Sequence, residues 1–280
     1  MPLTRACSAR ADSRKLALAH RTDHLVQRQI PHVILLTYLA WTLLCLGYLD
    51  QARAKREAAL AEARCLSGAF TLAHTLSWAT HAEAILVGPS GALVHAEEMV
   101  SVTERQGIDY YLTYAMAFQG WCLTMLGQQE KGITLLTRAL EVHRRALGLT
   151  RLQTVLTLMA DAYCKVRQPD DGLRQLAEAI SVTSRTQGRY YEAEMHRVRG
   201  DLYLSIHDDG AAEASFREAI SVAQHQSAKT WEPNRLRWVN GVRQVHCGAS
   251  PLRGPTGVAG RCGVDRYGCI GDQRRRQCTG

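Results

Sequence analysis

The chain has 280 residues, of which 46% are hydrophobic and only 6% aromatic. A chain of this length can bury one sizeable core or form a solenoid, and its composition favours Ala- and Leu-rich helices over a β-sandwich. The net charge of +8 comes from the two ends, because residues 31–232 carry more acidic than basic side chains. The central region therefore lacks the basic surface with which folded domains bind nucleic acid.

Residues 1–30 form a basic, polar N-terminal extension that we expect to be poorly ordered, because no clear hydrophobic period runs through it. His20 and His24 have the spacing of two metal ligands on one helical turn, but no acidic residue or Cys accompanies them. We interpret them as surface histidines and expect no metal site. No apolar segment directly follows the basic residues, as a secretory signal would require.

The longest apolar run, residues 33–47, is shorter than the roughly 20 residues that span a bilayer, so we expect no membrane partner. Five of the nine Cys lie singly, mostly within apolar helical stretches, which is typical of reduced thiols. The other four follow residue 232 without any C-x-x-C pair, which does not favour zinc. The sequence predicts a cytoplasmic protein without a metal or other cofactor.

Ten helical segments follow the N-terminal extension in pairs. The expected ranges are 33–46 with 50–66, 72–86 with a segment that resumes after a break at 88–91 and runs to 106, 110–126 with 130–147, 151–166 with 170–186, and 191–205 with 209–226. Asp50 is expected to cap the second helix. Glycines about one repeat apart, at positions 68, 107, 148 and 188, are expected to end helices in a left-handed conformation.

One pattern of small and large residues recurs through these pairs every 40 residues. Its clearest copy is Gly120, Leu123, Gly127, Gly132, Leu136 and Ala139. Small residues let paired helices approach closely, and stacked pairs bury the apolar stripes that an isolated pair exposes. The pattern resembles the tetratricopeptide repeat, although that repeat is normally about 34 residues long. The resemblance implies that residues 31–232 form an all-α, right-handed solenoid of about five helix-turn-helix repeats of about 40 residues.

The segment 233–280 has a different composition, with nine Arg, nine Gly, four Cys and neither Lys nor Glu. Such a segment buries too little apolar surface to offset its ordering entropy, so we predict a disordered tail. Our hypothesis is that it is an out-of-frame translation. The alternative is an Arg-rich arm that binds nucleic acid.

Candidate binding residues lie on the first helices of the repeats, and five of them, at positions 41, 81, 121, 161 and 201, occupy one equivalent position. In tetratricopeptide proteins these helices line a concave groove, and exposed aromatic and Arg side chains are typical interface anchors. The resemblance therefore implies that a protein or peptide partner contacts Thr37, Trp41, His81, Trp121, Asp161, Arg197 and Asp201. The spacing of the two Asp suits a basic or polar peptide. Alternatively, Trp41 and Trp121 fill the space between neighbouring repeats.

The sequence offers no set of catalytic residues. The loop from Gly127 to Thr134 has two glycines at the spacing of a phosphate-binding loop, but Ile133 stands where the phosphate-binding Lys is required. No Ser-His-Asp, Cys-His or zinc-protease arrangement can be assigned. We therefore predict that the chain is not an enzyme.

Three stretches, Leu46–Ala52, Tyr191–Gly200 and Ala214–Ile220, carry a more specific resemblance. They resemble the C-terminal tetratricopeptide region of bacterial signalling proteins that carry a class III adenylate/guanylate cyclase or a DNA-binding domain, followed by a predicted ATPase domain. The resemblance implies a detached scaffold or sensor module of such a regulator. The alternative is a nucleic-acid-associated regulatory protein that uses the Arg-rich tail. Because the family's array continues with another helix pair, we also expect an exposed apolar edge beyond Ala223 and self-association.

Overall fold

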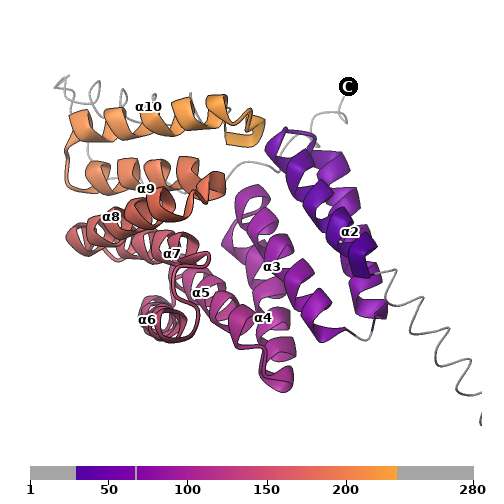
Figure 1. Ribbon diagram of the computed structural model, residues 1–280. Coiled ribbons are helices and arrows are strands. Elements are labelled where there is room, and N and C mark those ends of the chain that lie inside the picture. Colours follow the sequence, from indigo (N-terminus) through magenta and orange to yellow (C-terminus); the bar gives the residue numbers. More distant parts are fainter. Residues whose placement is uncertain (1–29, 67, 232–280) are drawn as a thin grey trace, which may run out of the picture.

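The computed structural model describes residues 30–66 and 68–231, and these ranges contain helices and no strand (Figure 1). The elements are a helix over residues 30–45, α2 (Leu49–Cys65), α3 (Ala69–Leu86), α4 (Pro89–Gln106), α5 (Asp109–Met125), α6 (Gln129–Ala146), α7 (Leu152–Lys165), α8 (Pro169–Thr186), η1 (Arg189–Tyr191), α9 (Glu192–Ser205), α10 (Asp209–His225) and η2 (Lys229–Trp231). Consecutive helices pack as pairs, and the predicted all-α solenoid is confirmed.

The predicted N-terminal extension (except for residue 30) and the Arg-rich tail lie outside the described residues. The same holds for His20, His24 and the out-of-frame hypothesis. Within the described ranges Cys45, Cys65 and Cys122 are free thiols, and Cys122 is buried in the core. No helix in these ranges is both long enough and apolar enough to cross a membrane.

The 40-residue period is visible in the backbone itself. Four turns between paired helices contain a residue with positive φ, namely Gly47, Gly127, Arg167 and His207, with φ of 86°, 97°, 62° and 62°. The turn between α3 and α4 places Gly88, with φ 98°, one residue later than the pattern. The repeat therefore fixes the geometry of each turn even where the sequence no longer supplies glycine.

Two of the four predicted helix-ending glycines adopt the left-handed conformation and two do not. Gly107 and Gly148 have φ of 62° and 60°. Gly188 has φ −82° because the preceding Gln187 already supplies the left-handed residue, with φ 56°. Gly68 has φ −90° and is the N-cap residue of α3. The prediction was wrong at positions 68 and 188, and at 188 the preceding residue makes the turn.

The predicted cap at Asp50 was also wrong. α2 begins at Leu49, so Asp50 lies in its first turn, and the N-cap residue Tyr48 makes no side-chain hydrogen bond to the helix. Asp50 still places a negative charge at the positive end of the helix dipole. α4 likewise begins earlier than expected, because Pro89 starts the helix as a favourable first residue.

The small residues of the repeat stand where paired helices approach most closely. A Cβ added to Gly132 of α6 would lie 2.5 Å from the carbonyl oxygen of Gly120 in α5. A Cβ on Gly172 of α8 would lie 2.6 Å from Leu202 of α9. At Gly132 the added Cβ would meet backbone, so the paired helices would have to separate, whereas at Gly172 it would meet the flexible end of a side chain from the next unit.

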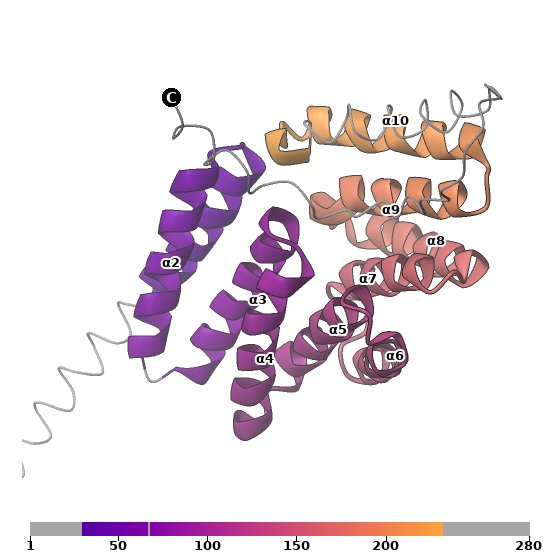
Figure 2. The same cartoon turned by 180° about the vertical axis from the view of Figure 1, so that it is seen from behind.

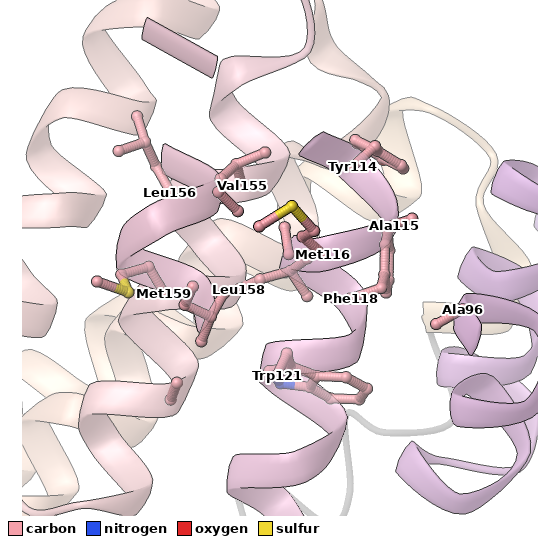
Figure 3. Packing of buried hydrophobic residues seen from close by; sticks show 14 of the residues in the cluster. Ala96, Tyr114, Ala115, Met116, Phe118, Trp121, Val155, Leu156, Leu158 and Met159 are labelled. Atoms are coloured by element: carbon pink, nitrogen blue, oxygen red, sulfur yellow. The ribbon is translucent and has the colours of Figure 1, made fainter. Parts of the chain in front are cut away.

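The main core runs through the middle repeats, where the first helices of neighbouring units meet. In Figure 3 the Met116 side chain of α5 lies beside Val155 of α7, and Tyr114 and Phe118 lie on the opposite side of α5. All four are at most 7% exposed. The stacking of first helices against one another thus forms a continuous core along the solenoid.

The stack curls until its last unit reaches its first (Figures 1 and 2). The Trp231 ring of η2 lies 6.3 Å from the Trp41 ring, and the Thr230 hydroxyl donates a hydrogen bond to the carbonyl oxygen of Leu44. Trp231 also packs with Ala223, which is fully buried. The exposed apolar edge expected beyond Ala223 is therefore a wrong prediction, because residues 228–231 cover it.

Candidate functional site

The seven predicted binding residues lie on first helices, as expected, but four of them are buried. Thr37 is 3% exposed, His81 0%, Trp121 5% and Asp161 3%. The other three, Trp41, Arg197 and Asp201, are half-buried. The structure brings them together in two groups, an aromatic group near the N-terminal units and a charged group near the C-terminal units.

The aromatic group begins with Thr37 and Trp41 on the helix over residues 30–45. The Thr37 hydroxyl donates to the Val33 carbonyl oxygen at 2.8 Å, which satisfies it within its own helix. The Trp41 ring lies 4.9 Å from the ring of Trp78 and 5.4 Å from that of His81. Trp41 therefore joins the first unit to α3 of the second.

His81 sits inside this aromatic group. Its ring centre is 4.8 Å from Phe118 and 4.9 Å from Tyr191, and its Nδ1 lies 3.1 Å from the hydroxyl of Tyr114. Burial, together with the charge of Arg151, holds the pKa of His81 well below its ordinary value. His81 is consequently a neutral packing residue at pH 7, which does not suit it for contact with an anion.

Arg151, which the sequence analysis did not select, lies beside His81 and faces the same aromatic rings. Its guanidinium carbon is 4.1 Å from the ring centre of Tyr114 and 4.9 Å from that of Trp78, distances typical of cation–π contacts. Its Nη2 donates to the Tyr114 hydroxyl at 3.0 Å. Within the described residues it forms no ion pair with a carboxylate.

A break in the repeat was the signal that would have identified Arg151. Positions 111 and 191 of the neighbouring units are Tyr, and both side chains are at most 5% exposed. An Arg at an equivalent position brings a charge into an aromatic site. Such departures from a repeat pattern tend to occur at functional or strained positions.

The charged group centres on Arg197 of α9. Its Nη2 lies 2.6 Å from Glu194 and 3.4 Å from Asp161 of α7, and its Nη1 pairs with Asp201. Asp161 also accepts a hydrogen bond of 2.8 Å from the Trp121 indole of α5. Although burial alone lowers it, the three carboxylates raise the pKa of Arg197 well above its ordinary value.

This charged group places three carboxylates around one guanidinium. The Glu194 and Asp201 side chains are each 19% exposed, so they remain accessible to a partner. In the described part of the chain, no group of three or more His, Cys, Asp or Glu side chains could hold a metal ion. The arrangement is suited to holding a cationic group by charge and hydrogen bonds.

The sequence matches no protein-family model and no curated protein. Solved structures that are similar to the chain include the following three. They are aspartyl phosphate phosphatase F from Bacillus subtilis (TM-score 0.52, 16% identity, 81% of this chain and 63% of that chain), the apo form of RapI (TM-score 0.53, 13%, 79% and 86%), and a Rap protein complexed with competence and sporulation factor (TM-score 0.56, 13%, 79% and 66%).

At these identities the similarity shows the fold alone, which is a tetratricopeptide-like array of helical repeats. The chain spans only 63% of the phosphatase structure and 66% of the Rap complex.

Proposed function

We propose that the chain is a non-catalytic interaction module that binds a peptide or a partner domain on the surface of its first helices. The observation that carries the proposal is the charged group around Arg197, where Glu194, Asp161 and Asp201 share one guanidinium. Partly buried carboxylates such as Glu194, whose side chain is 19% exposed, attract a cationic side chain more strongly than fully solvated ones do. The partner is therefore a segment that presents Lys or Arg.

The half-buried aromatic and charged residues give the partner its contact points. Trp41 belongs to the aromatic group, and Arg197 and Asp201 to the charged group. The four buried residues of the set pack beneath these half-buried residues and support them. They are Thr37, His81, Trp121 and Asp161. The fold similarity to a Rap protein complexed with competence and sporulation factor is compatible with a ligand on a helical repeat surface.

The test is peptide binding measured by fluorescence polarisation. The probes are labelled nonapeptides of matched length whose central residues are Lys-Arg, Glu-Asp or Ser-Ser. Basic peptides should bind at least about tenfold more tightly than acidic ones, a difference of about 1.4 kcal/mol. The double variant Glu194→Gln/Asp201→Asn should lose this preference.

The matched control is Glu213→Gln, which removes an exposed carboxylate that pairs with Arg217 in α10. It should leave peptide affinity unchanged. Equal binding of basic and acidic peptides by the unmodified protein would reject the proposed surface.

The proposal that the module is non-catalytic has its own measurement. Because one similar structure is of an aspartyl phosphate phosphatase, the informative substrate is acetyl phosphate, a small acyl phosphate. We expect the purified chain to leave its hydrolysis rate unchanged. A rate that rises in proportion to protein concentration would contradict the proposal.

We further propose that the chain is a cytoplasmic module of a bacterial signalling or transcription regulator, on the basis of the sequence resemblance. Self-association remains a prediction as well, although residues 228–231 cover the edge on which it was based. Light scattering that shows a monomer across a wide range of protein concentrations would contradict self-association.

A further inference from the structure

The helix over residues 30–45 exposes a mostly apolar stripe along its outer side. The exposed fraction is 67% for Leu35, 45% for Tyr38 and 42% for Leu39, and Thr42 is exposed as well. The Thr42 hydroxyl donates to the Tyr38 carbonyl oxygen at 2.9 Å, so it is satisfied within the helix and needs no polar partner from outside. We call these four residues the outer stripe.

The outer stripe lies opposite the side by which this helix packs into the fold. The buried residues of the helix are Val33, Thr37, Ala40 and Leu44. Leu44 packs with Ala52 of α2 and Ala82 of α3. At about 3.6 residues per turn, the buried residues and the outer stripe stand on opposite sides of the helix. The outer stripe therefore faces away from the array, with only Tyr38 at its edge touching the Trp78 ring of α3.

Every later unit buries the positions that the first unit exposes. The equivalents of Leu35 are at most 1% exposed, and they are Thr75, Ala115, Val155 and Met195. The equivalents of Thr42 are at most 8% exposed, and they are Ala82, Cys122, Ala162 and Leu202.

These positions are buried because the second helix of one unit packs on the first helix of the next, as α4 packs on α5 and α6 on α7. In Figure 3, Ala115 lies on the side of α5 nearest Ala96 of α4. Within residues 30–66 and 68–231, no such helix precedes the first unit. The outer stripe is thus a helix-packing face that the described part of the chain does not cover.

The composition of the first helix favours an identical helix as the occupant of this face. Residues 30–45 contain no Asp, Glu, Lys or Arg, so two copies of the outer stripe can meet without like-charge repulsion. The core of a homodimer interface is more apolar than the rest of a protein surface, and Tyr is enriched there. A stripe along one helix is also complementary to itself when two copies run antiparallel about a two-fold axis.

The other end of the array offers no matching face among the described residues. Trp231 is 5% exposed and packs with Ala223 and Ala228, so residues 228–231 cover the side of α10 on which a following unit would stack. Head-to-tail association of copies, which builds open filaments, therefore lacks its second surface. First unit against first unit remains, and this contact gives a closed pair.

We propose that two copies of this chain associate through the outer stripe as a two-fold symmetric dimer. The proposal rests on the self-association proposed above, and it places the contact on the first repeat and not on the last. It does not depend on peptide binding at the charged group around Arg197.

The test is sedimentation velocity of the full chain over a wide range of protein concentrations, in which a monomer–dimer equilibrium is expected. Leu35→Glu/Leu39→Glu places carboxylates in the interface and should raise the dimer dissociation constant at least about tenfold. Circular dichroism should stay unchanged, because both positions are exposed in the monomer. The matched control is Val94→Glu, which alters a residue of α4 that is 63% exposed and should dimerise like the unmodified protein.

A complementary variant identifies the occupant as a second copy. Leu35→Lys/Leu39→Lys should dimerise as weakly as the Glu variant, and mixing the two should restore the dimer, because opposite charges then face each other. A full chain that stays monomeric, as it would if residues 1–29 or another protein occupied the face, overturns both this interface and self-association. A dimer that the Glu variant does not weaken, or that mixing does not restore, overturns the outer stripe alone.

Discussion

The Arg197 guanidinium stabilises the fold because it neutralises carboxylates that lie close together. Arg197 is enclosed by three carboxylates, so removing the guanidinium leaves like charges close together with little solvent. We expect Arg197→Met to lower the free energy of unfolding by about 3 kcal/mol, measured by urea denaturation. Arg217→Met, which breaks the exposed pair with Glu213, should cost less than about 1 kcal/mol. Equal losses in both variants would contradict this account of the charged group.

A second residue-scale prediction concerns His74, which is buried beside Tyr111. Burial, and then the charge of Arg151, lowers the pKa of His74 from its ordinary 6.5 to about 4. The unfolded chain therefore binds a proton below pH 6.5 that the folded chain does not bind until about pH 4. Stability from this residue is fully present above pH 6.5 and falls as the pH decreases toward 4.

The expected loss is on the order of 3 kcal/mol for a shift of this size. It is measured as the difference between the unmodified protein and His74→Gln in unfolding free energy at pH 7.5 and pH 4.5. Taking the difference removes the contribution of carboxylates that titrate in the same range. Parallel pH profiles for the two proteins would contradict the prediction.

At the scale of helices, the close approach of α5 and α6 depends on the absence of a side chain at Gly132. An added Cβ would lie 2.5 Å from the Gly120 carbonyl oxygen and would also meet Thr124. We expect Gly132→Ala to destabilise the protein by about 1–3 kcal/mol, because the helices must separate. Thermal unfolding is the measurement.

The control for Gly132 is Gly210, which lies near the start of α10 as Gly132 lies near the start of α6. A Cβ on Gly210 would have only Asp208 within reach, at 3.8 Å. Gly210→Ala should therefore stabilise the protein by about 0.4–1 kcal/mol through the lower entropy of the unfolded chain. If both substitutions stabilise, the close approach of α5 and α6 has no energetic importance.

The elements were predictable because the signals for them are local. Small residues such as Gly120 and Gly132 and the apolar spacing around them identify each helix pair and its period. The exact ends were less predictable, since Gln187 adopts the left-handed conformation that was expected of Gly188. The sequence therefore indicates where a helix pair turns, but not which residue makes the turn.

The site was predictable only in part. The 40-residue spacing placed Trp121 and Asp161 on neighbouring first helices, and the structure joins them by a hydrogen bond. Their burial was not predictable, because it depends on how far the side chains of adjacent units extend. Arg151 was missed for a related reason, since its three aromatic neighbours come from different helices.

The contact between the first and last units depends on how all the repeats stack, and not on any one of them. In most repeat proteins each unit contacts its neighbours alone, so stability adds along the chain. Here Trp231 is 5% exposed and packs against Trp41, and Thr230 bonds to the Leu44 carbonyl oxygen, so two distant units hold each other. The accumulated curvature of five repeats produces this closure, and no local pattern predicts it.

Trp231→Ala tests whether the contact between the first and last units stabilises the folded protein. Removing a buried Trp costs about 3–5 kcal/mol when the surroundings cannot relax, and the loss here should be shared by the two units that meet. We expect hydrogen exchange to speed up not only in α10 but also in the helix over residues 30–45, which is distant in sequence. Faster exchange confined to α10 and η2 would mean that the ends touch without stabilising each other. Faster exchange at both ends would mean that this solenoid unfolds as a closed unit, so a partner bound to the first repeat would also stabilise the last.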